Sequence, residues 1–144
     1  MANMDAMLQE MPSTSAMLPP SRMVLLVEDY PTNIMVATMM LEYLGYEVLS
    51  ATSGAEALRI IESVTHPFMV ILMDVNMPEM DGLETTRNIR RLEEKKGFAH
   101  TIIGVTAHAL AGDRAHCLDA GMNDYMSKPI NPNILAQKLA HLVN

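Results

Sequence analysis

Four apolar runs of the chain are each followed by side chains that could do chemistry. These are Glu28 and Asp29 after the first run, Asp74 after the third, Thr106 after the fourth and Lys128 after the fifth. Clustered carboxylates repel one another, so a dry cluster of them protonates or binds a cation. Oxygen donors without cysteine or histidine favour Mg²⁺ or Ca²⁺ over zinc. If the three acids meet, they form a candidate site for a hard cation.

The lysine and the threonine suit a phosphoryl group beside such a cation. Mg²⁺ usually takes one or two protein carboxylates and keeps room for phosphate oxygens. Lys128 would meet one phosphoryl oxygen as a point charge, and Thr106 could donate to another. A carboxylate that the cation does not need could act as a nucleophile and form an aspartyl phosphate. Taken singly, each residue also fits a plain structural role as a strand end, a cap or a surface charge.

Short apolar runs alternate with helical patterns along the chain. Two of the runs, MVLLV and FMVILM, are apolar throughout, as expected of strands buried on both faces. We predict strands over Met23–Val27, Tyr46–Ser50, Phe68–Met73 and Thr101–Val105, with a short fifth strand at Tyr125 and Met126.

Capping residues mark the helices between these strands. Pro31 opens a helix that Gly45 ends, Ser53 and Glu56 form a capping box, and a further helix lies near Leu83–Lys95. Asp113 is expected to cap a short helix closed by Gly121, and Asn131 with Pro132 begins the last helix. Alternating strands and helices with buried strands predict an α/β fold, a doubly wound five-stranded parallel sheet with helices on both faces. Ligands bind such sheets at the carboxyl ends of the strands, where the residues named first should meet.

The composition excludes several classes of protein. The 144 residues suit one domain, and 10 Lys and Arg against 17 Asp and Glu give a net charge of −7. A non-specific nucleic-acid binder carries a basic patch, so we expect no direct nucleic-acid partner. No apolar run approaches the ~18 residues of a membrane span, and the N-terminus lacks the basic region of a secretory signal. We expect a cytoplasmic protein without membrane insertion.

Residues 1–21 differ from the rest of the chain in their Met, Pro and Ser content. This composition predicts a flexible leader before a single domain over residues 22–144, with a short docking helix as the alternative.

The other polar and reactive side chains carry weaker signals. The charged run from Arg90 to Lys96 is interpreted as a solvated helix face. Cys117 is interpreted as a buried small hydrophobe, and Met122 and Met126 as ordinary packing residues. The five histidines form no metal-ligand set and are expected at the surface or in loops: His66, His100, His108, His116 and His141.

From Arg22 to Asn144 the chain resembles a receiver domain of a two-component response regulator, in the CheY-like superfamily. The matching stretches are LLVEDYPTN, ILMDVNMPEMDG, IIGVTAHA and DYMSKPI, in that order. The residues of these motifs are most similar to those in receivers of hybrid sensor histidine kinases. The resemblance implies a flavodoxin-like sheet of order 2-1-3-4-5. It also implies a phosphorelay role in which a phosphohistidine partner donates a phosphoryl group.

The resemblance assigns a role to each site residue. It implies that Asp74 is the phospho-acceptor and that Mg²⁺ is held by Asp29, Glu28, Asp74 and the backbone carbonyl of Asn76. Thr106 and Lys128 would contact the phosphoryl oxygens. Tyr125 would be the aromatic switch, and Ala107 the small residue that leaves it room. Pro129 often follows the lysine through a cis bond. A downstream protein would bind the face built by the helix that begins near Asp113, the fifth strand and the last helix.

The chain departs from the common family pattern at two neighbouring positions. The acidic pair is Glu28 and Asp29 in place of two aspartates, which leaves metal binding intact. Tyr30 follows, where small polar or acidic residues are usual, and we expect its phenol to alter access to the site or the lifetime of the phosphoryl group.

Three readings of function are open at this point. The first is a phosphorylation switch that assists its own phosphorylation and dephosphorylation without being an enzyme in the ordinary sense. It would be either a stand-alone regulator or a segment of a hybrid kinase. The second is a Mg²⁺-dependent phosphatase with an aspartyl nucleophile, which usually needs a second acid where this chain has Asn76. The third is a pseudo-receiver that acts as a constitutive interaction module, but the acceptor, the metal acids and the lysine are all present.

Overall fold

A five-stranded parallel sheet forms the centre of the molecule. The computed structural model describes residues 22–107 and 111–143. The strands are β1 (Met23–Val27), β2 (Glu47–Ala51), β3 (Val70–Asp74), β4 (Ile102–Thr106) and β5 (Asp124–Ser127). Their order in the sheet is β2-β1-β3-β4-β5, and each neighbouring pair is parallel. The fold class and the strand order are therefore as predicted.

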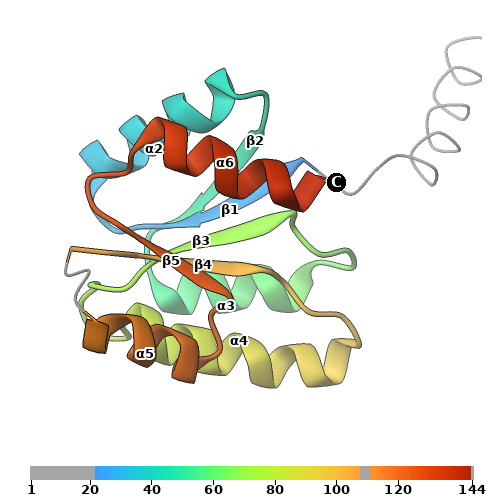
Figure 1. Ribbon diagram of the computed structural model, residues 1–144. Coiled ribbons are helices and arrows are strands. Elements are labelled where there is room, and N and C mark those ends of the chain that lie inside the picture. The colour runs from blue at the N-terminus through green and yellow to red at the C-terminus, as the bar shows by residue number, and fades with distance from the viewer. Residues whose placement is uncertain (1–21, 108–110, 144) are drawn as a thin grey trace, which may run out of the picture.

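Helices cover both faces of this sheet (Figure 1). Their bounds are α2 (Pro31–Tyr43), α3 (Gly54–Ser63), α4 (Gly82–Lys96), α5 (Ala111–Ala120) and α6 (Pro132–Val143). Helices α2 and α6 lie on one face, and α3, α4 and α5 lie on the other. Among the described residues, no helix is both long enough and apolar enough to cross a membrane. Residues 1–21, where we predict a leader, lie outside the described part.

Alternate strand residues supply two separate apolar cores. Leu26 and Leu72 face α2 and α6, where they pack with Ala37, Leu41 and Leu135. The neighbouring strand residues face the other way and pack against α3, α4 and α5: Leu25, Val27, Ile71, Met73 and Ile102. Burial on both faces explains why the central strands are apolar throughout.

The single cysteine and the two methionines singled out in the sequence lie in the cores. Cys117 is buried, as predicted, and burial raises the pKa of its thiol. Met122 and Met126 are also buried, so their role is packing, as predicted.

Three strands are displaced along the chain from the predicted runs. β2 and β4 each begin and end one residue later than predicted, and β3 begins at Val70 in place of Phe68. Apolar residues such as Phe68 and Met69 are buried without belonging to the sheet. The backbone ladder decides the strand ends: Asp74 pairs with Val105, so Asp74 is the last residue of β3 and does not follow it.

The helix caps follow the sequence with two corrections. Asn131 Oδ1 accepts hydrogen bonds from the backbone N–H groups of residues 133 and 134, as expected of an N-cap. Ser53 Oγ accepts from Glu56 N, but the Glu56 carboxylate accepts from Thr52 instead of closing the box on Ser53. Asp113 is not a cap, because α5 begins at Ala111 and places Asp113 in the first turn. A carboxylate there still interacts favourably with the helix dipole.

The prediction of a solvated charged face between Arg90 and Lys96 is wrong at Arg90 and Glu93, whose side chains are 25% and 5% exposed. Glu93 is buried, and its Oε1 lies 2.7 Å from Arg90 Nη1 while its Oε2 lies 2.8 Å from His100 Nδ1. His100 lies in the loop before β4, as predicted, but it is buried and not at the surface. Arg90 also donates to the carbonyl of Gly121 and to Asn123 Oδ1. This network ties α4 to the segments that precede β4 and β5.

Candidate active site at the carboxyl edge of the sheet

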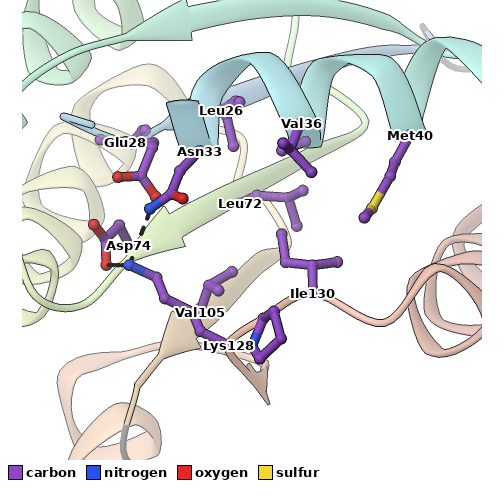
Figure 2. Close-up of a pocket in the computed structure, with 13 residues that line it drawn as sticks. Leu26, Glu28, Asn33, Val36, Met40, Leu72, Asp74, Val105, Lys128 and Ile130 are labelled. Carbon is purple, nitrogen blue, oxygen red and sulfur yellow. Dashed lines mark ion pairs between the residues drawn. The ribbon is translucent and has the colours of Figure 1, made fainter. Parts of the chain in front are cut away.

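The polar side chains singled out in the sequence lie at the carboxyl edge of the sheet. Glu28 and Asp29 follow β1, Asp74 ends β3, Thr106 ends β4 and Lys128 follows β5. Parallel strands bring these ends to one side, as the predicted topology requires. Figure 2 shows the Glu28, Asp74 and Lys128 side chains converging there.

An ammonium group joins the two buried carboxylates of this cluster. Lys128 Nζ lies 2.9 Å from Asp74 Oδ1 and 3.7 Å from Glu28 Oε1. The side chain of Asp74 is 2% exposed and that of Lys128 is 23% exposed. Lys128 is therefore the more accessible member of its ion pair with Asp74.

The three acids fit a hard cation. One carboxylate oxygen from each of Glu28, Asp29 and Asp74 lies within 4.8 Å of the others. Asp74 Oδ2 is buried and has no hydrogen-bond partner among the described residues. A buried carboxylate oxygen without a partner is costly unless something binds it. An all-oxygen set with one more accessible member, Asp29, suits Mg²⁺, which keeps part of its coordination for other oxygens.

Glu28 is held in place from two sides. Its Oε2 accepts a hydrogen bond from Tyr30 N at 3.0 Å, and its Oε1 faces Lys128. Burial raises the pKa of Glu28, and the neighbouring Asp74 carboxylate raises it further against the opposing effects of the Tyr30 N–H and Lys128. A charge that costs free energy in this position is one that a bound cation would stabilise.

Asn76 makes two contacts that sequence reasoning missed. Its backbone N donates to Asp74 Oδ1 at 3.0 Å, which helps to orient the Asp74 carboxylate. Its side-chain Oδ1 accepts from Ala107 N at 3.3 Å, which links the loop after β3 to the loop after β4. The resemblance had pointed only to the backbone carbonyl of Asn76, and a contact between two loops has no signal in local spacing.

The proposed switch residues lie on or directly after β4 and β5, the two neighbouring strands at one edge of the sheet. Thr106 is 2% exposed, and its carbonyl accepts a hydrogen bond from Lys128 N at 2.8 Å. Ala107 is exposed at the start of the loop that follows. Tyr125 is half-buried and packs against the core beneath α3, α4 and α5. Tyr30 is 58% exposed at the rim of the site. The Lys128–Pro129 peptide bond is cis, as the resemblance implied.

Gly82 lets the first turn of α4 approach the end of β3 closely. A Cβ atom at Gly82 would lie 2.3 Å from the carbonyl oxygen of Asp74 and 2.8 Å from Val75 Cα. Both are backbone atoms that cannot move aside. The glycine of the NMPEMDG stretch is thus required by close packing beside the site.

A hollow of about 400 Å³ adjoins the polar cluster (Figure 2). Glu28, Asp74 and Lys128 lie at one end, and the apolar side chains of Val36, Met40 and Ile130 line the rest. The hollow runs between α2 and the segment that joins β5 to α6.

Comparison with known proteins decides the family. The model of the response regulator receiver domain matches residues 24–140. This chain belongs to the response regulator receiver family. The receiver is similar to part of the sensor histidine kinase GacS of Pseudomonas protegens, with 43% identity over 115 residues. The match covers 79% of the receiver but only 12% of that kinase.

Solved receiver structures share the fold. The receiver domain of the sensor histidine kinase PA1611 of Pseudomonas aeruginosa, described with a magnesium ion in its active site cleft, is 42% identical with a TM-score of 0.75. The match covers 85% of this receiver and 98% of the PA1611 receiver chain. A complex of the Saccharomyces cerevisiae phosphotransfer protein Ypd1 with the receiver of Ssk1 matches with a TM-score of 0.78 and 28% identity, covering 88% of this chain and 91% of that one.

Proposed function

We propose that this receiver accepts a phosphoryl group from a phosphohistidine protein onto Asp74, with Mg²⁺ bound beside it. The observation that carries the proposal is the asymmetry of the Asp74 carboxylate. Oδ1 is held by Lys128 Nζ and Asn76 N, while Oδ2 has no partner among the described residues. One oxygen is thereby fixed and the other is left to react. The known complex of a phosphotransfer protein with a receiver of this fold supports a histidine donor.

The transfer step follows from this arrangement. Asp74 Oδ2 attacks the phosphorus, an O–P bond forms, and the P–N bond of the donor histidine breaks. The electron pair of the broken bond returns to the imidazole nitrogen, which takes up a proton from water. Lys128 and the Thr106 hydroxyl then hold the phosphoryl oxygens. Catalysis of this kind is positioning and charge neutralisation, and loss of the phosphoryl group to water uses the same residues.

Four groups of this chain would hold the cation. They are the carboxylates of Asp29, Glu28 and Asp74 and the backbone carbonyl of Asn76, with Asp29 as the direct acidic ligand and Glu28 acting through water. When bound, Mg²⁺ supplies positive charge against the phosphoryl oxygens. The oxygen-only donor set supports this choice, as does the magnesium described for the PA1611 receiver.

Phosphorylation would be read out through the loop after β4. Thr106 is drawn toward the phosphoryl group, Ala107 leaves space, and the Tyr125 ring follows inward. The face formed by α5, β5 and α6 then changes shape for a downstream protein. The position of Thr106 at the end of β4, beside Lys128, supports this sequence of events.

The proposal also covers the limits of the domain, its location in the cell and the protein it belongs to. We place the receiver domain over residues 22–144, after a leader of 21 residues, in the cytoplasm and without nucleic acid or membrane as direct partners. The curated relatives are far longer than the match, so a place within a hybrid histidine kinase is the second candidate. The exposed phenol of Tyr30 would set access to the site.

Phosphotransfer from purified histidine phosphotransfer proteins tests the proposal. We expect one of them to label the wild type in a Mg²⁺-dependent reaction, and Asp74→Asn to take up no label. Dephosphorylation of Tyr30→Asn at the wild-type rate would remove the role given to Tyr30. Label on Asp74→Asn equal to wild type would exclude Asp74 as the acceptor.

A further inference from the structure

Helix α2 carries an apolar stripe on the side that faces away from the sheet. Ala37 and Leu41 are buried against the sheet. On the opposite side lie four large exposed apolar side chains: Met35 (57%), Val36 (44%), Met39 (63%) and Tyr43 (90%). At about 100° per residue these four fall within about 100° of arc. Single exposed apolar residues are normal, whereas a contiguous apolar stripe of this kind marks an interaction surface.

The described part of the chain begins at one end of this stripe. Arg22 Nε donates to the carbonyl oxygen of Gly45 at 3.1 Å, and Arg22 Cζ lies 4.6 Å from the centroid of the Tyr46 ring. Gly45 N in turn donates to the carbonyl oxygen of Glu42 in the last turn of α2. Arg22 is therefore held beside the C-terminal end of α2, where Tyr43 ends the stripe. The leader joins the domain at this point.

The leader contains a second apolar pattern with helical spacing. Residues 3–11 are NMDAMLQEM, and their large apolar members are Met4, Met7, Leu8 and Met11. In a helix these four would fall within about 100° of arc, with Asp5, Gln9 and Glu10 outside that arc. Alanine, methionine, leucine, glutamine and glutamate favour helix, and Pro12 sets the limit of the pattern. A helix this short needs an apolar surface to pack against, because isolated helices below about 12 residues are marginal in water.

The length of the leader allows the two apolar patterns to meet. From Met35 to Tyr43 the helix rises about 12 Å, and a helix over residues 4–11 would have nearly the same length. Residues 12–21 can span at most about 35 Å, which exceeds the length of the stripe. A segment tethered this closely meets its surface at an effective concentration of about a millimolar. A modest apolar contact is therefore enough to hold it.

We infer that residues 4–11 dock on the exposed stripe of α2 as an amphipathic helix. The apolar side chains of this segment pack against Met35, Met39 and Tyr43. Methionine predominates on both sides of the contact, and its flexible side chain adapts to irregular apolar surfaces. Neither residues 4–11 nor α2 contains lysine or arginine, so burial of apolar surface and not ion pairing holds the contact.

The docked leader also stands beside the acceptor site. Val36 belongs to the stripe and lines the hollow whose other end holds Asp74 and Lys128 (Figure 2). Helix α2 begins two residues beyond Asp29. The leader therefore hinders the approach of another protein to Asp74 from this side, while a small molecule still enters. This shielding rests on the proposed function, but the docking contact does not.

Methyl NMR of the full chain tests the contact. Methionine with isotope-labelled ε-methyl groups reports on Met35 and Met39, and a soluble gadolinium chelate broadens the signals of exposed methyl groups. The test variant is Met7→Gln with Leu8→Gln, because glutamine keeps the helix propensity but removes the apolar surface.

The matched control is Ala6→Gln with Glu10→Gln, which introduces the same two side chains outside the apolar arc. We expect the chelate to broaden the Met35 and Met39 signals at least about threefold more in the test variant than in wild type, because the stripe loses its cover. The control should match wild type. In wild type the broadening should be the same at about 20 and about 500 µM protein, because dilution does not separate a tethered segment from its surface.

Phosphotransfer tests the shielding. The donor protein is the histidine phosphotransfer protein that labels the wild type fastest in a screen. The test variant should reach half-saturation at a donor concentration at least about threefold lower than wild type, because the leader no longer competes for the surface beside Asp74. Labelling by acetyl phosphate should stay at the wild-type rate, because this small donor passes the leader.

Four results would decide against parts of this account. Equal broadening of Met35 and Met39 in wild type and the test variant would overturn the docking contact. Cover of the stripe that increases with protein concentration would assign it to a second copy of the chain. Unchanged half-saturation of the test variant by the donor protein would overturn the shielding. A wild type that takes no label from either donor would contradict the proposed function, and the NMR measurement would still decide the contact.

Discussion

Asn76 and Ala107 connect the two loops that flank the acceptor. The Asn76 side-chain oxygen accepts a hydrogen bond from the backbone N–H of Ala107 across 3.3 Å. The backbone N of the same asparagine donates to Asp74 Oδ1 at 3.0 Å. Asn76 thus contacts both the Asp74 carboxylate and the loop that we propose to move, so this loop cannot shift inward without changing the contact.

Replacing Asn76 with alanine should loosen the loop after β4. The lost bond is worth about 1 kcal/mol, so amide exchange of Ala107 should accelerate about fivefold. Hydrogen exchange followed by NMR measures this amide directly. Asn88→Ala on α4 is the control and should leave the Ala107 amide unchanged. Equal exchange of Ala107 in wild type and Asn76→Ala would show that the contact does not restrain the loop.

Replacing Lys128 with methionine should have opposite effects on metal binding and on chemistry. The ammonium group 2.9 Å from Asp74 Oδ1 repels a cation, so its removal should tighten Mg²⁺ binding severalfold. Labelling by acetyl phosphate should fall about 100-fold, because the phosphoryl oxygens lose a charged partner. Calorimetric Mg²⁺ titration and labelling rates give the two readouts.

The control for Lys128 is Lys138→Met. Lys138 Nζ lies 2.6 Å from Asp124 Oδ2 and makes no ion pair with Asp74. The Lys138→Met variant should therefore behave as wild type in both assays. Loss of Mg²⁺ binding in Lys128→Met, or labelling at the wild-type rate, would disagree with the role given to Lys128.

Gly82→Ala should destabilise the domain through a backbone clash. The added Cβ would meet the Asp74 carbonyl oxygen at 2.3 Å, which forces the first turn of α4 away from β3. Overpacking of this kind costs about 2 kcal/mol of unfolding free energy, measurable by urea denaturation. Gly97→Asn is the comparison, because Gly97 has a φ of 84° and no atom within 4 Å of an added Cβ. Asparagine tolerates that conformation, so a Gly82→Ala effect no larger than that of Gly97→Asn would refute the clash.

Acid should remove the stabilisation that Glu93 provides. Burial raises the pKa of Glu93, but hydrogen bonds from His100 and Arg90 outweigh burial and hold the pKa below its ordinary value of 4.5. A carboxyl with a depressed folded pKa stabilises the fold above its unfolded pKa and loses that contribution as pH falls through the folded pKa. Glu93→Gln should therefore cost about 3 kcal/mol of unfolding free energy at pH 7.

The difference in unfolding free energy between wild type and Glu93→Gln should shrink as the pH falls below about 4.5. Urea denaturation at several pH values measures it. Glu94→Gln, at an exposed position on the same helix, should cost little at any pH. A Glu93→Gln cost that is constant from neutral to acid pH would show that the charge of Glu93 is not what stabilises the network.

The grouping of the polar residues at the carboxyl edge of the sheet could be predicted from the sequence, because it depends only on topology. Apolar runs such as those ending near Val27 and Met73 indicate buried parallel strands. In a parallel sheet the residues that follow the strands all lie at the carboxyl edge. For this reason the sequence alone groups Glu28, Asp74 and Lys128. The strand limits do not follow from apolar character, because pairing with Val105 on β4 decides that Asp74 belongs to β3.

Contacts between distant segments could not be predicted from the sequence, because they depend on tertiary packing. Glu93 reads as one more charge on a polar helix, and only tertiary packing brings His100 to its carboxylate. The bond from Asn76 to Ala107 likewise joins two loops separated by a whole helix.

Mass spectrometry of the chain after reaction with acetyl phosphate tests the central claim most directly. We predict one phosphoryl group per chain, located on Asp74 by peptide mapping, dependent on Mg²⁺ and absent from Asp74→Asn. A phosphoryl group on another residue, or equal labelling of wild type with and without Mg²⁺, would contradict the account.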